Sequence, residues 1–293
     1  MASSKVDLGG CVELDDLPEW DGSVSVPDLD SNEFEFIKSN NIEECICSWI
    51  IVGQAGNQDT NRKIILDDIS PDKLDNLVND PSITKIKIYS HIHCVISEDT
   101  ILHILSSKYV TDFSINLQKV NEKIVKAIAD NKSIKECELF QCGVTNEMCK
   151  ILVTSTSITN LHLRYDKLDL ESVKTLCTSD IITKLDLWWN GLDLECCKIL
   201  AKNKNLTHLD IGENQITDQG VIYLLNNPSI VYLDIQAVYM EDEELVLKHL
   251  ENNNNLVYLG TNCAFNDYEI EKQVEKHIAK NRLNQQLSKL TIE

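Results

Sequence analysis

ITKLDLWWNGL, residues 182–192, lies between two stretches of the same pattern, ITNLHLRYDKL (158–168) and LTHLDIGENQI (206–216). The three align on one template, L-x-x-L-x-L-x-x-N-x-L, and each begins 24 residues after the previous one. Internal repetition at a fixed period is typical of repeat architectures. Two adjacent tryptophans, Trp188 and Trp189, occupy variable positions of the template, where the repeat requires no apolar residue.

The register continues on both sides of these copies. Intervals of 24 residues separate the residues at position one, which are Val110, Ile134, Ile158, Ile182, Leu206 and Ile230. Position four reads Phe113, Cys137, Leu161, Leu185, Leu209 and Leu233, and position six reads Ile115, Leu139, Leu163, Leu187, Ile211 and Ile235. Degraded copies begin at Ile83, 27 residues before Val110, and at Leu256, 26 residues after Ile230. The repeats therefore extend over residues 83–262.

Each unit divides into a short strand and a helical half. Leucine-type residues two apart have the period of a strand, whereas pairs such as Ile199 and Leu200 recur at helical spacing. One unit cannot bury its own apolar face, but parallel stacking gives a continuous core with strands on one side and helices on the other. We therefore predict an α/β solenoid.

The template resembles that of the leucine-rich repeat family, at the leucine-type positions and at Asn190 and Asn214 in position nine. The helical half with Gly220 is similar to the ribonuclease-inhibitor-like class in a 24-residue form. The resemblance implies a horseshoe with a parallel sheet on the concave side and helices on the convex side. This short form also resembles the repeats of effectors from intracellular bacteria.

In that family the position-nine side chain hydrogen-bonds the turn backbone of neighbouring units. Weaker copies here carry other residues at this position, Gln118, Cys142 and Asp166, and the ladder breaks at Val238 and Ala264.

The chain outside the repeats divides into three parts. Residues 1–33 are acidic and rich in turn residues, and we predict a flexible arm in which Trp20 is a candidate docking residue. Residues 34–82 are expected to form an N-terminal cap or irregular first repeat. Residues 263–293 are expected to be a C-terminal capping helix, although their acidic and apolar residues are also compatible with a bacterial type IV export signal.

More detail can be predicted at both ends. The cap should contain a buried strand in CICSWIIV (45–52), a loop over 53–63 and a helix over 69–80 that has Pro71 near its first turn. One face of the C-terminal helix is expected to carry Ile270, Val274, Ile278 and Leu287.

Composition excludes several classes of partner. The 293 residues include 27 Lys and Arg against 47 Asp and Glu, and the net charge of −20 opposes binding to nucleic acid or to an anionic membrane. We expect a protein partner with a basic or mixed surface, and a monomeric chain. No apolar run is long enough to span a bilayer and no secretory signal begins the sequence, so we expect a cytoplasmic protein, or one that a bacterium secretes into a host cytosol. Eleven cysteines at hydrophobic positions are interpreted as reduced thiols.

No motif in the sequence points to catalysis. Phosphate-binding, dinucleotide-binding and nucleophile-elbow glycine motifs are absent. His91, His93 and Cys94 in HIHC form a compact set of potential metal ligands, but no second pair completes a tetrahedral site. Cys196 and Cys197 lie on the helical half without a histidine placed beside them, and are interpreted as core residues. We therefore expect a protein that is not an enzyme and has neither cofactor nor metal.

The variable positions of the strands carry the candidate binding site. If positions one, four and six point into the core, positions three, five and seven point onto the concave face and position eight lies at its edge. Strands about 4.8 Å apart place these residues in one continuous patch. Aromatic residues and arginine are enriched at interface hot spots, and exposed aromatic patches mark interaction sites. The expected partner-binding residues are Phe140, His162, Arg164, Tyr165, Asp186, Trp188, Trp189, His208, Asp210, Glu213, Tyr232, Asp234 and Tyr258.

Two alternatives for these side chains remain open. Trp188 and Trp189 could fold against the sheet edge or the N-terminal arm instead of facing solvent. Asp186, Asp210 and Asp234 at position five could form a solvated row, because like charges on neighbouring strands repel and need a cation or water.

We predict a non-enzymatic protein–protein interaction module that binds a protein partner on its concave face and acts as an effector in a host cell. One alternative is a substrate-recruiting adaptor subunit of a ubiquitin ligase, for which residues 1–82 would have to dock a ligase core. Another is a purely structural repeat protein.

Overall fold

The computed structural model describes residues 49–54, 57–65, 71–90, 95–262 and 264–290. The chain divides into two units, Met1–Cys47 and Ser48–Glu293, and every described residue belongs to the second. The arm predicted over 1–33 and the HIHC segment at 91–94 lie outside the described residues. Among the described helices, none has both the length and the apolar character that crossing a membrane requires.

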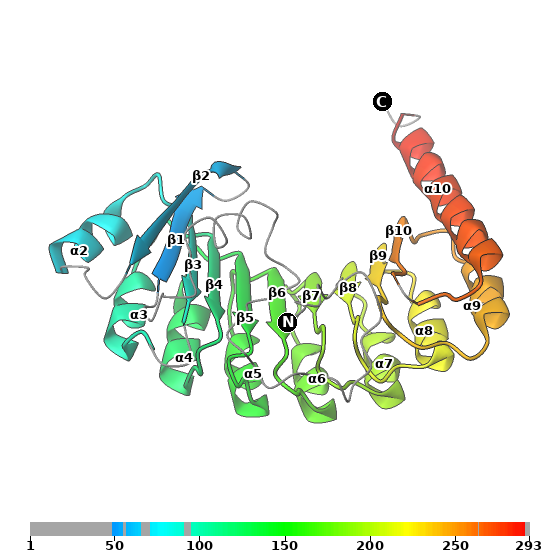
Figure 1. The fold of residues 1–293 in the computed structure, drawn as a ribbon, viewed down its shortest axis with the longest axis horizontal. Helices are drawn as coiled ribbons and strands as arrows, with labels where there is room; N and C mark the ends of the chain where they lie inside the picture. Colours follow the sequence, from blue (N-terminus) through cyan, green and yellow to red (C-terminus); the bar gives the residue numbers. More distant parts are fainter. Residues whose placement is uncertain (1–48, 55–56, 66–70, 91–94, 263, 291–293) are drawn as a thin grey trace, which may run out of the picture. The chain divides into compact units, whose positions relative to one another are not determined.

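A ten-stranded sheet runs through the unit Ser48–Glu293 (Figure 1). Its parallel strands follow one another in chain order: β3 (Lys85–Tyr89), β4 (Asp112–Asn116), β5 (Glu136–Phe140), β6 (Asn160–Arg164), β7 (Lys184–Asp186), β8 (His208–Asp210), β9 (Tyr232–Asp234) and β10 (Tyr258–Gly260). Between β4 and β9, residues 24 apart pair in register, as Leu161 does with Leu185. At the two ends Lys85 pairs with Asp112 and Tyr232 with Tyr258, which reproduces the longer intervals in the sequence.

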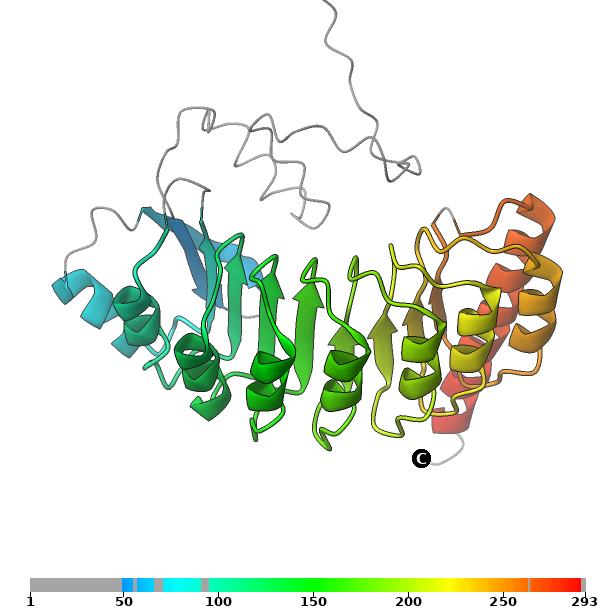
Figure 2. The same cartoon turned by 90° about the horizontal axis from the view of Figure 1, so that it is seen from below.

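One helix follows each strand from β3 to β9. These helices are α3 (Glu98–Ile104), α4 (Glu122–Asp130), α5 (Asn146–Leu152), α6 (Leu170–Leu176), α7 (Leu194–Leu200), α8 (Asp218–Leu225) and α9 (Glu243–Leu250). They lie in a row on the convex side of the sheet, whose other face is concave (Figures 1 and 2). Side chains that accept backbone hydrogen bonds start most of them, namely Ser97, Asn121, Thr145, Asp169, Asp193 and Asp242.

The core lies between the sheet and the helices. Every residue at positions one, four and six from Val110 to Ile235 is at most 3% exposed, as the repeat pattern predicts. Cys196 and Cys197 are buried in this core, which confirms their interpretation as packing residues.

Position-nine asparagines tie neighbouring repeats together. Asn190 Nδ2 donates to Leu163 O at 2.7 Å and to Leu187 O at 3.0 Å, so it reaches both the preceding repeat and its own. Its Oδ1 accepts two backbone N–H groups of the preceding repeat at 3.1 and 3.2 Å. Asn214 makes the corresponding contacts one repeat later. These buried amides satisfy turn groups that would otherwise be unpaired.

Where position nine is neither asparagine nor glutamine, its residue satisfies the turn less completely. Cys142 donates its thiol to a carbonyl of the preceding repeat at 3.2 Å. Asp166 accepts from Gly143 N at 2.6 Å through Oδ1, but its Oδ2 is buried with no hydrogen-bond partner among the described residues. At Val238 and Ala264, which have no polar side-chain group, a backbone hydrogen bond closes the turn.

Two predictions for the N-terminal cap are confirmed and one is wrong. The expected strand is present as β1 (Trp49–Gln54) and the helix expected over 69–80 as α2 (Pro71–Asn79). The loop expected over 53–63 is instead largely a strand, β2 (Asn57–Ile65), antiparallel to β1, which is itself antiparallel to β3. An edge strand is held by backbone hydrogen bonds on one side and tolerates polar residues, so its composition imitates that of a loop.

The C-terminal helix is confirmed as α10 (Tyr268–Leu290), with one correction to its buried face. Ile270, Val274 and Ile278 are buried, but Leu287 is 53% exposed. At 3.6 residues per turn Leu287 lies roughly 100° round the helix from Ile270, so the two do not share a face. In Figure 1 the last turns of α10 extend away from the repeats.

Candidate functional site: the concave face of the sheet

The expected binding residues lie on the concave face of β5–β10 and in the turns that follow these strands. Most are half-buried, whereas Phe140 is 8% exposed and Asp186 5% exposed. The ring of Tyr165 packs against Phe140, and the side chains of Arg164 and His162 contact Asp186. Phe140 and Asp186 therefore lie beneath their neighbours and contribute little exposed surface to the face.

Position eight has a left-handed backbone in six successive repeats. The residues are Leu117, Gln141, Tyr165, Trp189, Glu213 and Ala237, with φ between 51° and 61°. This conformation costs an L-residue with a Cβ roughly 1–2 kcal/mol and is least unfavourable for glycine and asparagine. The left-handed backbone at position eight therefore disfavours bulky side chains such as those of Tyr165 and Trp189.

Four aromatic side chains form a contiguous cluster along the edge of the concave face, here called the aromatic rim: Phe140, Tyr165, Trp188 and Trp189. The ring centroids of Tyr165 and Trp189 are 5.4 Å apart and stacked, and those of Trp188 and Trp189 are 5.2 Å apart and tilted. Phe140 lies 6.1 Å from Tyr165. Such geometries are favourable for aromatic pairs, and they join three consecutive repeats.

Trp188 reaches sideways over the neighbouring repeat. A Cβ atom on Gly212, which stands 24 residues later, would lie 2.8 Å from Trp188 Cδ1 and 3.2 Å from Trp188 Nε1. The missing side chain at Gly212 therefore makes the space in which the indole lies. Sequence reasoning missed Gly212, although writing the repeats under one another places it directly beside Trp188.

A second aromatic group lies at position three of the last strands. His208 and Tyr232 stack with ring centroids 5.3 Å apart, and Tyr232 and Tyr258 stack at 4.0 Å with an interplanar angle of 4°. The parallel register places these rings side by side on adjacent strands. Together with the aromatic rim, they give the face two apolar patches on either side of the position-five acids.

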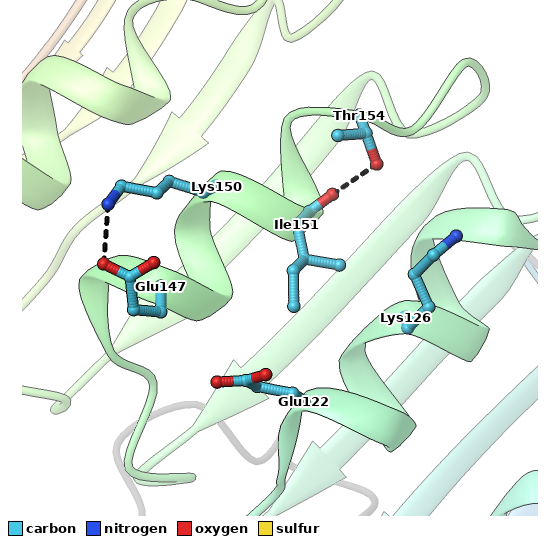
Figure 3. Close-up of a pocket in the computed structure, with 6 residues that line it drawn as sticks. All are labelled: Glu122, Lys126, Glu147, Lys150, Ile151 and Thr154. Carbon is cyan, nitrogen blue, oxygen red and sulfur yellow. Dashed lines mark hydrogen bonds and ion pairs between the residues drawn. The ribbon is translucent and has the colours of Figure 1, made fainter.

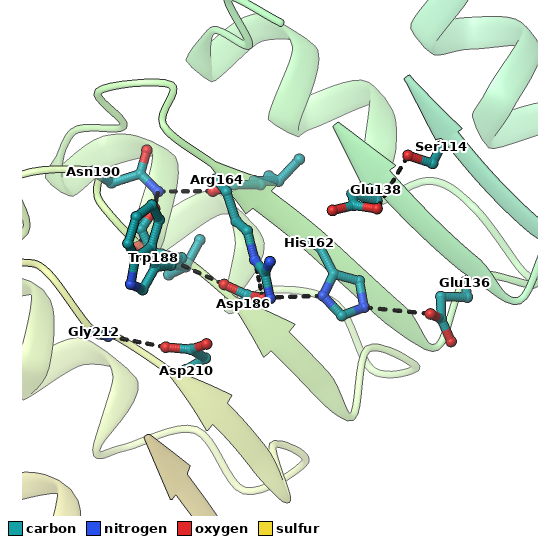
Figure 4. Close-up of polar contacts among 12 residues, drawn as sticks. Ser114, Glu136, Glu138, His162, Arg164, Asp186, Trp188, Asn190, Asp210 and Gly212 are labelled. Carbon is teal, nitrogen blue, oxygen red and sulfur yellow. Dashed lines mark hydrogen bonds and ion pairs between the residues drawn. The ribbon is translucent and has the colours of Figure 1, made fainter. Parts of the chain in front are cut away.

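Asp186 on β7 is the centre of a charged network (Figure 4). Its Oδ2 accepts from Arg164 Nε and lies 3.1 Å from His162 Nδ1, while its Oδ1 accepts from Trp188 N at 3.0 Å. On the other side, His162 Nε2 lies 3.8 Å from Glu136 Oε1. Two cationic side chains of the chain itself therefore surround this carboxylate.

The network changes the pKa of both titratable partners. Burial alone would raise the pKa of Asp186, but hydrogen bonding to His162 and the charge of Arg164 lower it. Burial alone would lower the pKa of His162, but the hydrogen bond with Asp186 and its charge raise it. The contact therefore favours the charged form of both groups.

Asp210 and Asp234 on the next two strands have no such counterions. Each accepts a backbone N–H two residues later at 3.0 Å, and within the described part of the chain no cationic side chain forms an ion pair with either. Burial, followed by repulsion from Asp186 and Asp234, raises the pKa of Asp210 to about 8. Burial also raises the pKa of Asp234. The acids at position five are thus unequal, because Asp186 is ion-paired with basic side chains and the next two are not.

One comparison with known proteins, a match to a family model, agrees with this architecture. A family model described as Leucine Rich repeat matches residues 202–225, which run from just after α7 to the end of α8. The fold is a leucine-rich-repeat solenoid. The tropomodulin C-terminal domain of Caenorhabditis elegans is 19% identical, with a TM-score of 0.40 over 50% of this chain and 98% of that chain. Leiomodin-1 Actin-Binding Site 2 is 15% identical, with a TM-score of 0.29 over 76% of this chain and 96% of that chain. No curated protein matches the sequence.

The convex side of the solenoid carries charges that pair among themselves. A groove between α4 and α5 is lined by Glu122, Lys126, Glu147, Lys150, Ile151 and Thr154 (Figure 3). Lys150 Nζ lies 2.6 Å from Glu147 Oε1, and the same pair recurs as Glu171–Lys174 at 2.7 Å and Glu195–Lys198 at 2.6 Å. These pairs are exposed and add little stability. The glutamates of these pairs on the convex side have lysine partners, whereas Asp210 and Asp234 on the concave face form no ion pair within the described residues.

Burial raises the pKa of every cysteine in the described part of the chain. Burial raises the pKa of Cys149 to about 12 and of Cys196 to about 11, so these thiols are not activated nucleophiles. Among the described residues, no three His, Cys, Asp or Glu side chains are grouped so that they could hold a metal. The concave face is a surface of stacked rings and carboxyl groups, which suits recognition of another molecule.

Proposed function

We propose that the chain is a protein–protein interaction module that binds a protein partner on the concave face. The observation that carries this proposal is the aromatic rim, in which the stacked rings of Tyr165 and Trp189 are half-buried and not enclosed in the core. Half-exposed tryptophan and tyrosine are the side chains that dominate interface energies, and exposed aromatic patches mark interaction sites. A purely structural repeat protein would have no need of bulky rings at these positions.

The chemistry of the face indicates the kind of partner. The chain has a net charge of −20, and Asp210 and Asp234 lack counterions among the described residues. A basic or mixed protein surface would associate with this face faster and more specifically than an acidic one. We propose that the chain meets such a partner as a monomer.

Substitution of the rim tests the proposal. Trp188→Ala with Trp189→Ala should abolish capture of the partner from a lysate of the cells in which the chain acts, as measured by quantitative mass spectrometry. Because both rings are half-buried, circular dichroism and Tm must show that the variant remains folded. Tyr223→Ala is the matched control, since this tyrosine is 42% exposed on α8 at the convex side. Equal capture by the rim variant and the control would exclude the concave face.

We also propose that the protein acts as an effector in a host cell. The support for this part is the resemblance of the 24-residue repeat to those of bacterial effectors. The test is a translocation reporter fused to the chain and expressed in the organism that encodes it. Reporter activity in the host cytosol is the expected result, and its absence there, with normal expression of the fusion, would contradict the effector role.

A further inference from the structure

The concave face points to a specific contact with the partner, and this inference rests on the proposed function above. We propose that the partner places a basic side chain, arginine or lysine, against the indole ring of Trp188 and beside the carboxyl group of Asp210. The site would join two neighbouring repeats, since Trp188 belongs to the repeat of β7 and Asp210 lies on β8.

Gly212 brings these two side chains together. Its backbone N–H donates to Asp210 Oδ1 at 3.0 Å, and the indole of Trp188 lies in the space that a Cβ at Gly212 would need. Figure 4 shows Trp188, Asp210 and Gly212 as neighbours, on the opposite side of Asp186 from His162 and Glu136. The geometry therefore sets an aromatic ring beside a carboxyl group at one point on the face.

The distribution of charge selects a cation for this point. Asp186 already has Arg164 and His162, whereas Asp210 stands between Asp186 and Asp234 and has no ion-pair partner within the described residues. A cation there would relieve the repulsion between adjacent acids. An arginine or lysine over a tryptophan face gains roughly 0.5–2 kcal/mol more from the ring quadrupole, and tryptophan is the best ring for this contact.

A metal ion is a poorer fit than a basic side chain. The described residues contain no group of three or more potential ligands, and an indole ring is not a metal ligand. Partial burial of Asp210 also favours a planar, weakly hydrated guanidinium over a strongly hydrated ion.

The bound cation would compete with a proton. The pKa of Asp210 is raised to about 8 by burial and by Asp186 and Asp234, which face it from β7 and β9, while Gly212 and Arg164 act in the opposite direction. A cation favours the ionised carboxylate, so binding near pH 7 releases a proton. The affinity should therefore rise as pH increases through about 8 and level off above it.

The decisive experiment uses the full chain and a fluorescein-labelled peptide of alternating arginine and glycine. A matched peptide in which citrulline replaces arginine keeps the shape of the side chain and removes its charge. Fluorescence anisotropy at physiological salt should show that the arginine peptide binds at least about fivefold more tightly. Asp210→Asn should weaken this binding about fivefold, and should also remove its rise with pH.

Glu171→Gln is the control, because it removes one negative charge from the convex side, where Glu171 pairs with Lys174. The affinity of the Glu171→Gln variant for the arginine peptide should stay within about twofold of the wild-type affinity. Equal losses in Asp210→Asn and Glu171→Gln, or equal binding of the citrulline peptide, would overturn the proposed cation site. Trp188→Leu, checked for folding by circular dichroism, should weaken binding to a similar extent as Asp210→Asn, and unchanged binding would also overturn it.

The outcomes separate this inference from the proposed function. If the rim variant loses the captured partner while Asp210→Asn retains it, the interaction module stands and the cation site fails. If the arginine peptide binds through Asp210 but the wild-type chain captures no protein, the cation site stands and the proposed function fails.

Discussion

The indole of Trp188 lies in the space that a side chain at Gly212 would need, with Trp188 Cδ1 2.8 Å from the position of the missing Cβ. That separation is shorter than real Cβ contacts allow, and the atom belongs to a rigid ring. The φ of Gly212 is not in the left-handed region, so the glycine is required for space and not for backbone freedom. The tryptophan and the glycine are therefore one structural unit shared by two repeats.

Gly212→Ala should displace Trp188 from the concave face. Overpacking of this kind typically costs about 1–3 kcal/mol, which urea unfolding would measure, and the tryptophan emission spectrum of the native state should shift. Gly191→Ala is the contrasting control. Gly191 has φ +77° and nothing within 4 Å of its Cβ position, so its substitution should destabilise by backbone strain without moving the indole. Similar spectra for the wild type and Gly212→Ala would contradict this assignment.

Asp166→Asn should stabilise the solenoid at neutral pH. Burial raises the pKa of Asp166 to about 6, and its Oδ2 has no partner among the described residues, whereas an amide there would donate as Asn190 and Asn214 do. The raised pKa means that the folded state binds more protons, so the wild type loses stability as pH rises from about 4 to about 6. The gain from asparagine should be roughly 2–3 kcal/mol above pH 6 and should vanish near pH 3.

Asp169→Asn is a matched control for that experiment. Backbone hydrogen bonding at the start of α6 lowers the pKa of Asp169, which is the opposite direction. Its stabilising contribution is present above the unfolded pKa and is lost as pH falls through the folded value. Asp169→Asn should therefore lower stability at neutral pH. Relative to the wild type, the free energy of unfolding at neutral pH should rise in Asp166→Asn and fall in Asp169→Asn.

The asparagine ladder can be tested at Asn214. Its amide donates to Leu187 O, Ile211 O and Gly212 O and accepts from two backbone N–H groups. Asn214→Ala would leave these buried groups unpaired, at about 1–3 kcal/mol for each that water cannot reach. We expect a loss of more than about 3 kcal/mol in the free energy of unfolding. Cys142→Ala, at the same position of another repeat, removes a thiol donor and should cost about 1 kcal/mol.

The core and the strand register could be predicted because apolar side chains at fixed intervals mark burial directly. Leu161 and Leu185 are 24 residues apart in the sequence and pair in the sheet, and both are at most 2% exposed. β2 could not be predicted in this way, because an edge strand depends on backbone pairing that its polar residues do not reveal.

The sequence could place the candidate residues on the concave face, but it could not predict the contacts among them. The variable positions identified Trp188 and Asp210, yet their meeting at Gly212 depends on a side chain crossing from one repeat to the next. The sequence also could not predict that Asp186 is ion-paired and Asp210 is not, because this difference depends on the direction of the Arg164 and His162 side chains. Side-chain direction across repeats is a tertiary property that one unit of the template does not contain.

Removal of residues 268–293 should test α10 as the cap of the solenoid. Asn281 is fully buried and donates to Asn253 O and Leu256 O at 2.9 Å, and the buried Val274 lies one turn from Ile270 and Ile278. Without α10 the last repeat would expose its apolar edge, so we expect aggregation, measured by light scattering, and a lower Tm. Removal of residues 286–293 alone should leave both properties unchanged.

Asp186→Asn should disrupt the charged network on β6 and β7. The substitution removes the carboxylate that Arg164 and His162 share, and breaking a buried pair in this way typically costs about 3–5 kcal/mol. In the wild type, the raised pKa of His162 contributes stability below the unfolded value of 6.5 that is lost as pH rises through the folded value. The lowered pKa of Asp186 contributes stability above 3.8 that is lost as pH falls through its folded value.

The network should therefore stabilise the fold most between about pH 4 and pH 6.5. NMR titration of the imidazole resonances should place the pKa of His162 above 6.5 in the wild type and at a lower value in Asp186→Asn, because the hydrogen bond and the charge that raise it are lost while burial remains. His208 is the internal reference, since burial and Lys184 lower its pKa and it makes no contact with Asp186 within the described interactions. An unchanged His162 titration in the variant would show that Asp186 does not control its charge.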